Sequence, residues 1–448
     1  MAGLLIKFFV CQAEGRVVKY DDMKNGTSFP DGFLWGSATS SHQVEGDNAN
    51  NDWWKWESEG RFKEPSGIAC DQYRLFKNDF KLARSLHHNA HRFSLEWSRI
   101  EPEEGRFDGD AIIHYREVIR TLRSLGITPI VTINHFTLPL WFANKGGWLG
   151  KRSGEEFAAY AGKVAEELGQ DVTYWLTVNE PVGNLNGAYI EGKWPPGKSS
   201  MKEAARAFIN VLRAHCLAYK AVHRVYKIRK WPSPKVSLAH FTLTYSPCRP
   251  KSIADNLAAK MRHYYVNRLF IESLIKGRCL APGFPRTILP AGRSLDFIGL
   301  NYYTRDYVHK DKLFSSDFFG YICSTQHHKD SGKRNFLRWE IYPQGFYDMI
   351  MEFSRYKMPI LITENGICTN DDNDRIDFIK SHVKEVSRAI KDGAPVFGYL
   401  YWSLIDNFEW AHGYGPRFGL AEVDYSSQRR TVRPSARIYA DIIKSNGI

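Results

Sequence analysis

Short apolar runs rich in β-branched and aromatic residues alternate along this chain with longer segments in which apolar residues recur at every third or fourth position. Runs of the first kind predict buried strands, and the longer segments predict amphipathic helices. The expected strands are residues 33–38, 90–94, 128–134, 174–178, 236–241, 297–301, 360–363 and 396–402. The expected helices are residues 71–86, 111–125, 154–168, 201–228 and 375–391.

Eight strands alternating with helices favour a parallel sheet closed into a barrel. By length alone, 448 residues would suggest two or three domains, but one barrel with insertions accommodates the same length. A doubly wound sheet would place its site at a single switch point, whereas polar residues here follow several strands: His135, Glu180, Tyr303 and Glu364. The sequence therefore predicts the α/β fold class, with a single-domain (β/α)8 TIM barrel over residues 29–448.

Residues 1–28 form a leader before the first expected strand. Residues 2–10 are apolar apart from Lys7, which resembles the apolar part of a signal peptide, but a basic start and a clear cleavage site are missing. We expect a poorly ordered leader, with a cleaved signal as the alternative. No later apolar run reaches the roughly 18 residues that a membrane span requires.

The composition is that of an ordinary globular protein, with 43% hydrophobic and 25% charged residues. A formal charge of +12 would suit an acidic polymer or surface as partner. The basic residues are scattered, however, and their densest group, residues 224–230, is typical of a solvated helix face. Because no nucleic-acid-binding signature occurs either, we expect neither a nucleic-acid nor a membrane partner, and the oligomeric state stays open.

The chain contains seven cysteines, an odd number without a Cys-x-x-Cys motif, so we expect neither a disulfide framework nor a zinc site. Free thiols suit a reducing compartment and favour a cytoplasmic location. The histidine pairs at 87–88 and 327–328 are expected to face solvent, because a metal site would need more ligands at fitting spacing. No motif indicates a redox cofactor or a phosphate-binding loop, so no cofactor is expected.

Two glutamates sit in short motifs directly after expected strands. Glu180 lies in the segment Thr-Val-Asn-Glu-Pro, and Glu364 lies in Ile-Thr-Glu-Asn-Gly. Singly, each has an ordinary interpretation, as a neighbour of a helix cap, an ion-pair partner or the cap of a surface loop. A charge after an apolar strand is costly to bury unless it is paired, however, and two carboxyls delivered from strand ends are what glycosidic bond cleavage requires. The pair therefore predicts a glycosidase site.

Five segments carry a resemblance to a known family. They are residues 33–46 (FLWGSATSSHQVEG), 92–99 (RFSLEWSR), 177–181 (TVNEP), 362–366 (ITENG) and 402–410 (WSLIDNFEW). With them, the chain resembles the glycoside hydrolase family 1 β-glycosidases from about Phe29 to about Tyr439. The resemblance implies a retaining enzyme that works through a covalent glycosyl-enzyme intermediate and takes a small-molecule β-glycoside. A transglycosylase on the same carboxyls and a non-catalytic sugar-binding barrel are the alternatives.

The resemblance also implies roles for individual positions. Glu180 would be the general acid and base, and Glu364 the nucleophile. Arg92 and Tyr303 would flank and orient Glu364. The other implied residues bind the sugar or support the site: Asn179 at the 2-hydroxyl, Gln43, His135 and Glu409 at the other hydroxyls, Trp402 as the floor, Trp410 at the outer edge of the sugar, and Asn301 near the two carboxyls.

The chemistry sets conditions on the two glutamates. A retaining mechanism requires carboxyl groups about 5–5.5 Å apart. Glu364 has to be ionised to attack the anomeric carbon, and a cation such as Arg92 would favour that form. Glu180 has to be protonated, and a neighbouring negative charge should raise its pKa. The sequence therefore predicts opposite protonation states for two nearby carboxyls.

The expected substrate is a terminal, non-reducing β-D-glucoside, with β-galactosides and β-fucosides close behind. Relatives that act on 6-phosphorylated sugars are expected to carry Ser and Lys in the loop that here contains Glu409, whose carboxylate would repel a phosphate. Two departures from the family pattern stand out. Residues 278–295 have little helical character, so the helix after the fifth strand looks shortened or missing, and Phe136 replaces a Trp that many relatives carry beside His135.

Overall fold

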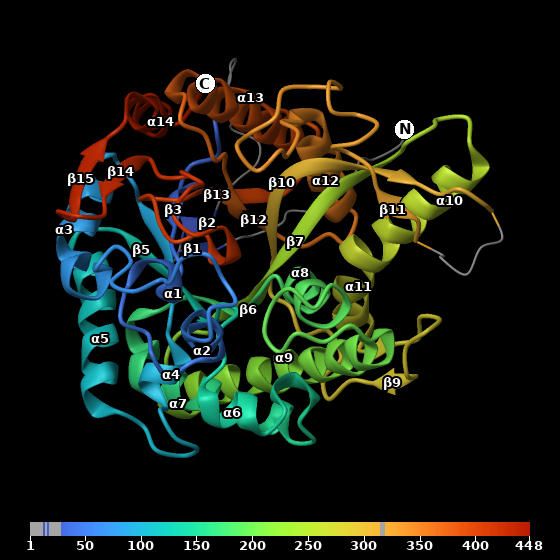
Figure 1. The fold of residues 1–448 in the computed structure, drawn as a ribbon. Helices are drawn as coiled ribbons and strands as arrows, with labels where there is room; N and C mark the ends of the chain where they lie inside the picture. The colour runs from blue at the N-terminus through green and yellow to red at the C-terminus, as the bar shows by residue number, and fades with distance from the viewer. Residues whose placement is uncertain (1–11, 14–15, 18–27, 314–318) are drawn as a thin grey trace, which may run out of the picture.

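The computed structural model describes residues 12–13, 16–17, 28–313 and 319–448 (Figure 1). Most of the leader expected over residues 1–28 lies outside the described residues. Within it, β1 (Gln12–Ala13) and β2 (Arg16–Val17) form an antiparallel pair.

Eight parallel strands close into a barrel, which confirms the predicted (β/α)8 fold (Figure 1). Each strand pairs in parallel with the next one around the ring, and the last strand returns to pair with the first. The strands are β3 (Leu34–Ala38), β4 (Ala90–Ser94), β5 (Thr128–Asn134), β6 (Tyr174–Asn179), β7 (Lys235–Pro247), β10 (Ile298–His309), β12 (Ile360–Asn365) and β13 (Val396–Trp402).

Amphipathic helices surround the barrel and bury their apolar faces against it (Figure 1). Side-chain caps mark several of their starts; for example, Asp108 accepts a hydrogen bond from Ala111 N, and Ser200 accepts one from Glu203 N. The longer helices are α3 (Gln72–Ser85), α5 (Gly109–Ser124), α7 (Ser153–Leu168), α9 (Met201–Arg229), α12 (Pro343–Ser354), α13 (Asp372–Lys391) and α14 (Pro434–Ser445).

The barrel interior is a packed core. Leu34, Leu176 and Leu400 come from different strands and belong to one cluster of buried side chains inside the ring. Side chains of this kind fill the interior of such barrels in layers. Chemistry is therefore restricted to the ends of the strands, and the two predicted glutamates lie at carboxyl-terminal ends, Glu180 directly after β6 and Glu364 near the end of β12.

Helices do follow the fifth barrel strand, so the helix that was expected to be shortened or missing is present. Between β7 and β10, helix α10 (Ile253–Arg262) continues through a π-helical turn (His263–Arg268) into α11 (Leu269–Lys276). Ser252 caps this run by accepting from Asp255 N, and Leu274 is among the side chains that it buries. The helix lies before the segment 278–295, which contains only two short strands, β8 (Arg278–Cys279) and β9 (Thr287–Ile288).

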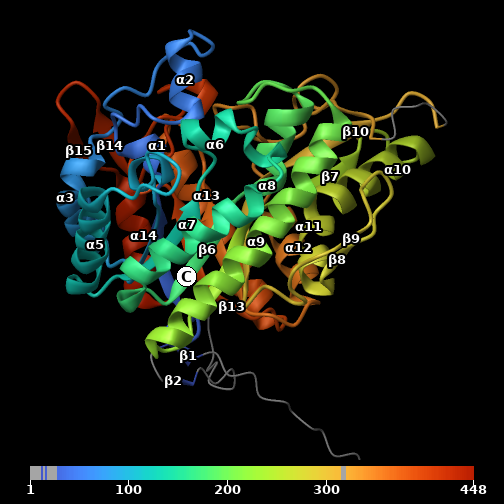
Figure 2. The same cartoon turned by 90° about the horizontal axis from the view of Figure 1, so that it is seen from below.

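The strands β7 and β10 extend well beyond the rest of the barrel. They are 13 and 12 residues long, and they stay paired as far as Pro247 and Val308. On its other edge, β10 pairs with the short antiparallel strand β11 (Tyr321–Ile322). This projection lies beside α10 and on the same side of the molecule as α2 (Asp52–Ser58), α6 (Leu140–Asn144) and α8 (Pro181–Leu185) (Figure 2).

One expected surface residue is buried. His88 has no exposed surface, which contradicts the expectation that the pair 87–88 faces solvent. Its ring packs edge-on against Tyr439 of α14, and burial lowers its pKa to about 3. Within the described residues, no helix has the length and apolar character that crossing a membrane demands.

Candidate active site

Glu180 stands at the turn from β6 into α8. Its backbone adopts the left-handed conformation, with φ of 42°, and Pro181 starts the helix directly after it. The side chain points back into the site, where Asn301 Nδ2 donates to Oε1 at 2.8 Å. Burial and, next, the charge of Glu364 raise the pKa of Glu180 to about 8. This carboxyl is therefore protonated at neutral pH.

Glu364 lies within β12 and is almost fully buried. The Arg92 guanidinium donates to Oε1, and the Tyr303 hydroxyl donates to Oε2 at 2.7 Å. Arg92 is itself fully buried on β4. A buried carboxylate is tolerated when it is paired with a cation and hydrogen-bonded, and both conditions are met here. Glu364 is thus held between a guanidinium and a hydroxyl donor.

One chain of hydrogen bonds joins the two glutamates. Asn179 Oδ1 accepts from Arg92 at 2.7 Å and from Asn301 at 3.2 Å. Arg92 also donates to Glu364, and Asn301 also donates to Glu180. The structure therefore brings the predicted pair of carboxyls, and the residues expected beside them, into a single site.

Gln43 and Glu409 lie together at another edge of this site. Gln43 is fully buried, and its Nε2 donates to Phe408 O at 2.8 Å and to Glu409 Oε2 at 3.3 Å. Ser40 donates to Gln43 Oε1 at 2.6 Å, which fixes the orientation of the amide. Burial and, next, the charge of Glu364 raise the pKa of Glu409 to about 8. The two side chains present a polar pair next to the nucleophile candidate.

Three flat rings form a wall of the site. The His135 ring lies nearly parallel to Trp402, with centroids 5.9 Å apart, and nearly parallel to Trp410, with centroids 6.0 Å apart. Asn179 Nδ2 contacts His135 Nε2 at 2.9 Å. Burial and, next, the charge of Arg92 hold the pKa of His135 well below its usual range, so the imidazole is neutral. A neutral ring that accepts at Nε2 carries its hydrogen on Nδ1.

Phe136, the departure beside His135, belongs to an aromatic cluster. Its ring lies 4.9 Å from that of Trp410, and both pack with Trp53 of α2. Trp339 packs against Tyr303, with ring centroids 5.6 Å apart. Neither Trp53 nor Trp339 was among the residues predicted for the site. Trp53 lies in α2 and Trp339 in the loop before α12, and the polar residue beside each in the sequence was the available signal.

Most polar atoms of this site are hydrogen-bonded to one another, with the buried His135 Nδ1 as an exception, and among the described residues none of the predicted site residues belongs to a cluster of metal-ligating side chains. Within the described ranges, such clusters occur around Cys248, at the end of β7. The site therefore offers carboxyls, amides and aromatic faces as its chemical groups.

The chain is similar to known proteins over most of its length. The sequence profile of Glycosyl hydrolase family 1 matches residues 25–448. The chain is 35% identical to "Beta-glucosidase A" of Thermotoga maritima, with 95% of this chain and 99% of that protein covered. It is 32% identical to "Beta-galactosidase" of Pyrococcus woesei, with coverage of 94% and 98%. Among solved structures, "beta-glycosidase from Pyrococcus horikoshii" superposes with a TM-score of 0.88 at 40% identity, with coverage of 94% and 96%.

Proposed function

The chain belongs to glycosyl hydrolase family 1, and from this premise we propose that it is a retaining β-glycosidase acting on terminal β-D-glucosyl residues, with galactosyl and fucosyl residues as further substrates. The protein is a glycoside hydrolase of the β-glucosidase type. The catalytic domain in this proposal comprises residues 29–448. Relatives named for glucosidase and for galactosidase activity support both sugars.

The observation that carries the proposal is the contrast between the two carboxyls. Glu364 is held by a guanidinium and a phenol, as an attacking carboxylate requires, whereas the pKa of Glu180 is raised to about 8. Pairs of carboxyls with opposed protonation states are typical of acid–base assignments in glycosidases.

Two displacement steps follow from these roles. Glu364 attacks the anomeric carbon and forms an ester to the sugar, while Glu180 transfers its proton to the departing glycosidic oxygen. With Glu364 esterified, the negative charge that raises the pKa of Glu180 is gone. Glu180 then accepts a proton from water, which attacks the same carbon and releases the sugar with retained configuration.

The sugar is bound by the groups beside these carboxyls. In this proposal, Asn179 contacts the 2-hydroxyl, which lies next to the reacting carbon. The other hydroxyls are bound by Gln43, His135 and Glu409, while Trp402 and Trp410 provide apolar faces. Buried hydrogen-bonding groups of this kind reject analogues that lack the matching hydroxyl.

The proposed sugar is unphosphorylated. Glu409 lies near Glu364 and shares one hydrogen bond with Gln43. A phosphate at this edge of the sugar would meet the Glu409 carboxyl, whose hydrogen-bond partner among the described residues is the neutral amide of Gln43. We therefore expect a glucoside to be cleaved far faster than the corresponding 6-phosphoglucoside.

The assignment of Glu364 is tested with Glu364→Ala and an activated aryl β-glucoside. Turnover should be abolished, and azide should restore it by entering the space of the missing carboxylate, giving an α-glycosyl azide. A panel of aryl β-glycosides then ranks glucose, galactose and fucose. An unchanged rate in Glu364→Ala, or a β-configured azide product, would remove Glu364 from this role.

A further inference from the structure

Two cysteines flank the projecting end of β10, and the proposed hydrolysis does not use them. Cys248 follows β7 directly, and its backbone N–H donates to Val308 O at 2.8 Å. Cys323 follows β11, and its backbone N–H donates to Tyr307 O at 2.9 Å. Since β7 and β11 flank opposite edges of β10, both cysteines are fixed by the backbone at the same level of the strand.

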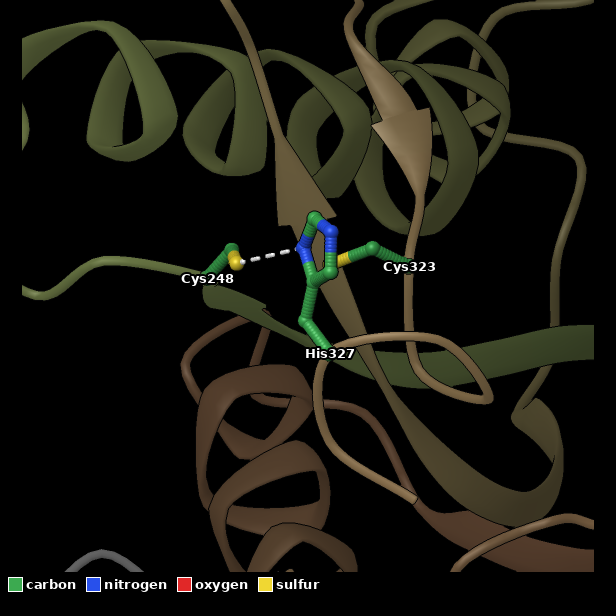
Figure 3. Close-up of side chains that lie close together, drawn as sticks. All are labelled: Cys248, Cys323 and His327. Carbon is green, nitrogen blue, oxygen red and sulfur yellow. Dashed lines mark hydrogen bonds between the residues drawn. The ribbon is translucent and has the colours of Figure 1, made fainter.

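The two thiols converge on an imidazole. Cys248 Sγ lies 3.3 Å from His327 Nδ1 (Figure 3). The ligand atoms of Cys248, Cys323 and His327 all lie within 4.8 Å of one another. His327 follows Cys323 in a tight turn, where its N–H donates to Cys323 O at 2.9 Å. Thiolate sulfur and imidazole nitrogen are preferred ligands of Zn²⁺, which binds them at about 2.3 Å and 2.0–2.1 Å respectively.

A buried histidine next to these residues provides an independent observation. His309, the last residue of β10, is only 8% exposed, and its buried Nδ1 has no hydrogen-bond partner among the described residues. Its Nε2 lies 3.0 Å from the Asp311 carboxylate, which can only accept. In the neutral ring, Nε2 therefore carries the hydrogen and Nδ1 has a free electron pair; Nδ1 lies 3.8 Å from Asp255 Oδ2, beyond hydrogen-bond distance. Metal-ligating histidines are typically held by a carboxylate in this way.

His309 also lies close to Cys248. A ligand atom of His309, Cys248 Sγ and a carboxylate oxygen of Asp255 lie within 4.8 Å of one another. Asp255 already accepts hydrogen bonds from the Arg249 side chain and from the backbone of Lys310. The Asp255 carboxylate is therefore already used as an acceptor. His309, whose Nδ1 has no hydrogen-bond partner among the described residues, is the better candidate ligand.

We propose that Cys248, Cys323 and His327 bind a zinc ion, with Nδ1 of His309 available for the fourth position. Binding replaces the two thiol protons by the ion, so two protons are released and no electrons are transferred. The affinity for zinc should accordingly rise with pH.

The ion would fasten the loop that follows β11. Arg334 donates to Ser324 O at 2.9 Å and to His328 O at 2.7 Å, which ties the later part of this loop to the cluster. Farther along this loop, Trp339 packs against Tyr303, whose hydroxyl donates to Glu364 in the active site. The role that we propose for the zinc is therefore structural, at the rim of the barrel end where the chemistry takes place.

The test uses the full chain, freed of metal with a chelator and kept reduced, and titrated with Co²⁺ as a spectroscopic probe. One equivalent should produce thiolate-to-cobalt charge-transfer bands and the visible bands of tetrahedral cobalt, and Zn²⁺ should displace them. Cys248→Ser and Cys323→Ser should lose the charge-transfer bands, and His327→Ala should weaken binding by at least about tenfold. Cys216→Ser, which removes a buried thiol on α9, should retain the bands.

A second measurement does not depend on the variants folding well. Zinc added to the metal-free wild type should raise Tm, because a ligand that binds only the folded state stabilises it, and the same addition should leave the Tm of Cys248→Ser unchanged. The proposal is overturned if the wild type takes up no cobalt, or if the charge-transfer bands persist in both cysteine variants. It is also overturned if freshly isolated protein contains a disulfide between the two cysteines.

Discussion

Glu364 is buried and Glu180 is partly buried, and the two carboxyls accept hydrogen bonds from different kinds of donor. Glu364 accepts from a guanidinium and a phenol, whereas Glu180 accepts from the neutral amide of Asn301. The charge on Glu364 contributes to the raised pKa of Glu180. The charge state of Glu364 therefore influences the pKa of Glu180.

The role of Glu180 predicts a dependence on the leaving group. In Glu180→Ala, kcat/KM for alkyl β-glucosides should fall by about 10²–10⁴-fold, because general acid assistance is lost. Aryl glucosides with very acidic phenols need little assistance and should lose far less. The measurement is kcat/KM across a series of aryl glucosides, with the exposed Glu191→Ala as control. An equal loss for good and poor leaving groups would contradict the acid assignment.

The raised pKa of Glu180 also predicts how stability depends on pH. Because this pKa is about 8 in the folded protein and 4.5 in the unfolded chain, the folded state binds more protons between these values. Folding stability contributed by this group therefore falls as pH rises through that window. Glu180→Gln keeps an acceptor for Asn301 but cannot ionise, so at pH 8 it should be more stable than the wild type by about 1 to 3 kcal/mol.

Urea unfolding at pH 5 and pH 8 measures this difference. The advantage of Glu180→Gln should be small at pH 5, where the wild-type carboxyl is protonated in the folded state, and clear at pH 8. An advantage that is the same at both pH values would show that the effect does not come from the titration of Glu180.

At the scale of secondary structure, the buried strands were predictable and their extensions were not. The expected strand at 128–134 coincides with β5, because its apolar and β-branched residues are buried and runs of this kind have few other interpretations. The strands β7 and β10, by contrast, were expected to end at 241 and 301 but continue to Pro247 and His309. Their outer halves are only partly buried, and pairing with each other and with β11 makes them strands. Pairing between strands that are distant in the sequence produces no hydrophobic periodicity from which these extensions could have been predicted.

The site was predictable to the extent that its residues lie in local motifs. Glu180 and Glu364 each follow an apolar run, so their positions at strand ends could be inferred. The cluster of Cys248, Cys323 and His327 gave no such signal, because Cys248 follows β7 whereas the other two follow β11, and these segments are adjacent only in the folded barrel. Spacing rules for metal sites assume ligands that are close in sequence.

The helices after β7 predict a clear stability difference between two leucines. Leu274 in α11 has no exposed surface, whereas Leu280, just beyond the helix, is 55% exposed. Leu274→Ala should lower the free energy of unfolding by about 2–5 kcal/mol, because it leaves a cavity against the barrel. Leu280→Ala should change it by less than about 0.5 kcal/mol. Similar losses in the two variants, measured by denaturant unfolding, would mean that α11 does not pack against the barrel.

At the scale of the whole molecule, the end of the chain closes the barrel at the side opposite the active site. Asn446 follows α14 in the left-handed conformation, with φ of 49°. Its Oδ1 accepts from the buried indole of Trp35 at 2.9 Å, and its Nδ2 donates to Phe29 O at 2.8 Å. Trp35 lies near the start of β3, so this residue links the first strand, the segment before it and the last helix.

Replacing Asn446 should therefore destabilise the fold without changing the chemistry. Asn446→Gly loses both side-chain hydrogen bonds and leaves the Trp35 indole unpaired, which should cost about 1–3 kcal/mol. Asn446→Ala should cost about 1 kcal/mol more, because alanine tolerates the left-handed conformation poorly. Denaturant unfolding gives both values, and kcat on an aryl β-glucoside should stay at the wild-type level at temperatures where each variant is folded. A loss of kcat under those conditions would show that the two ends of the barrel are coupled, since no contact of Asn446 reaches Glu180 or Glu364.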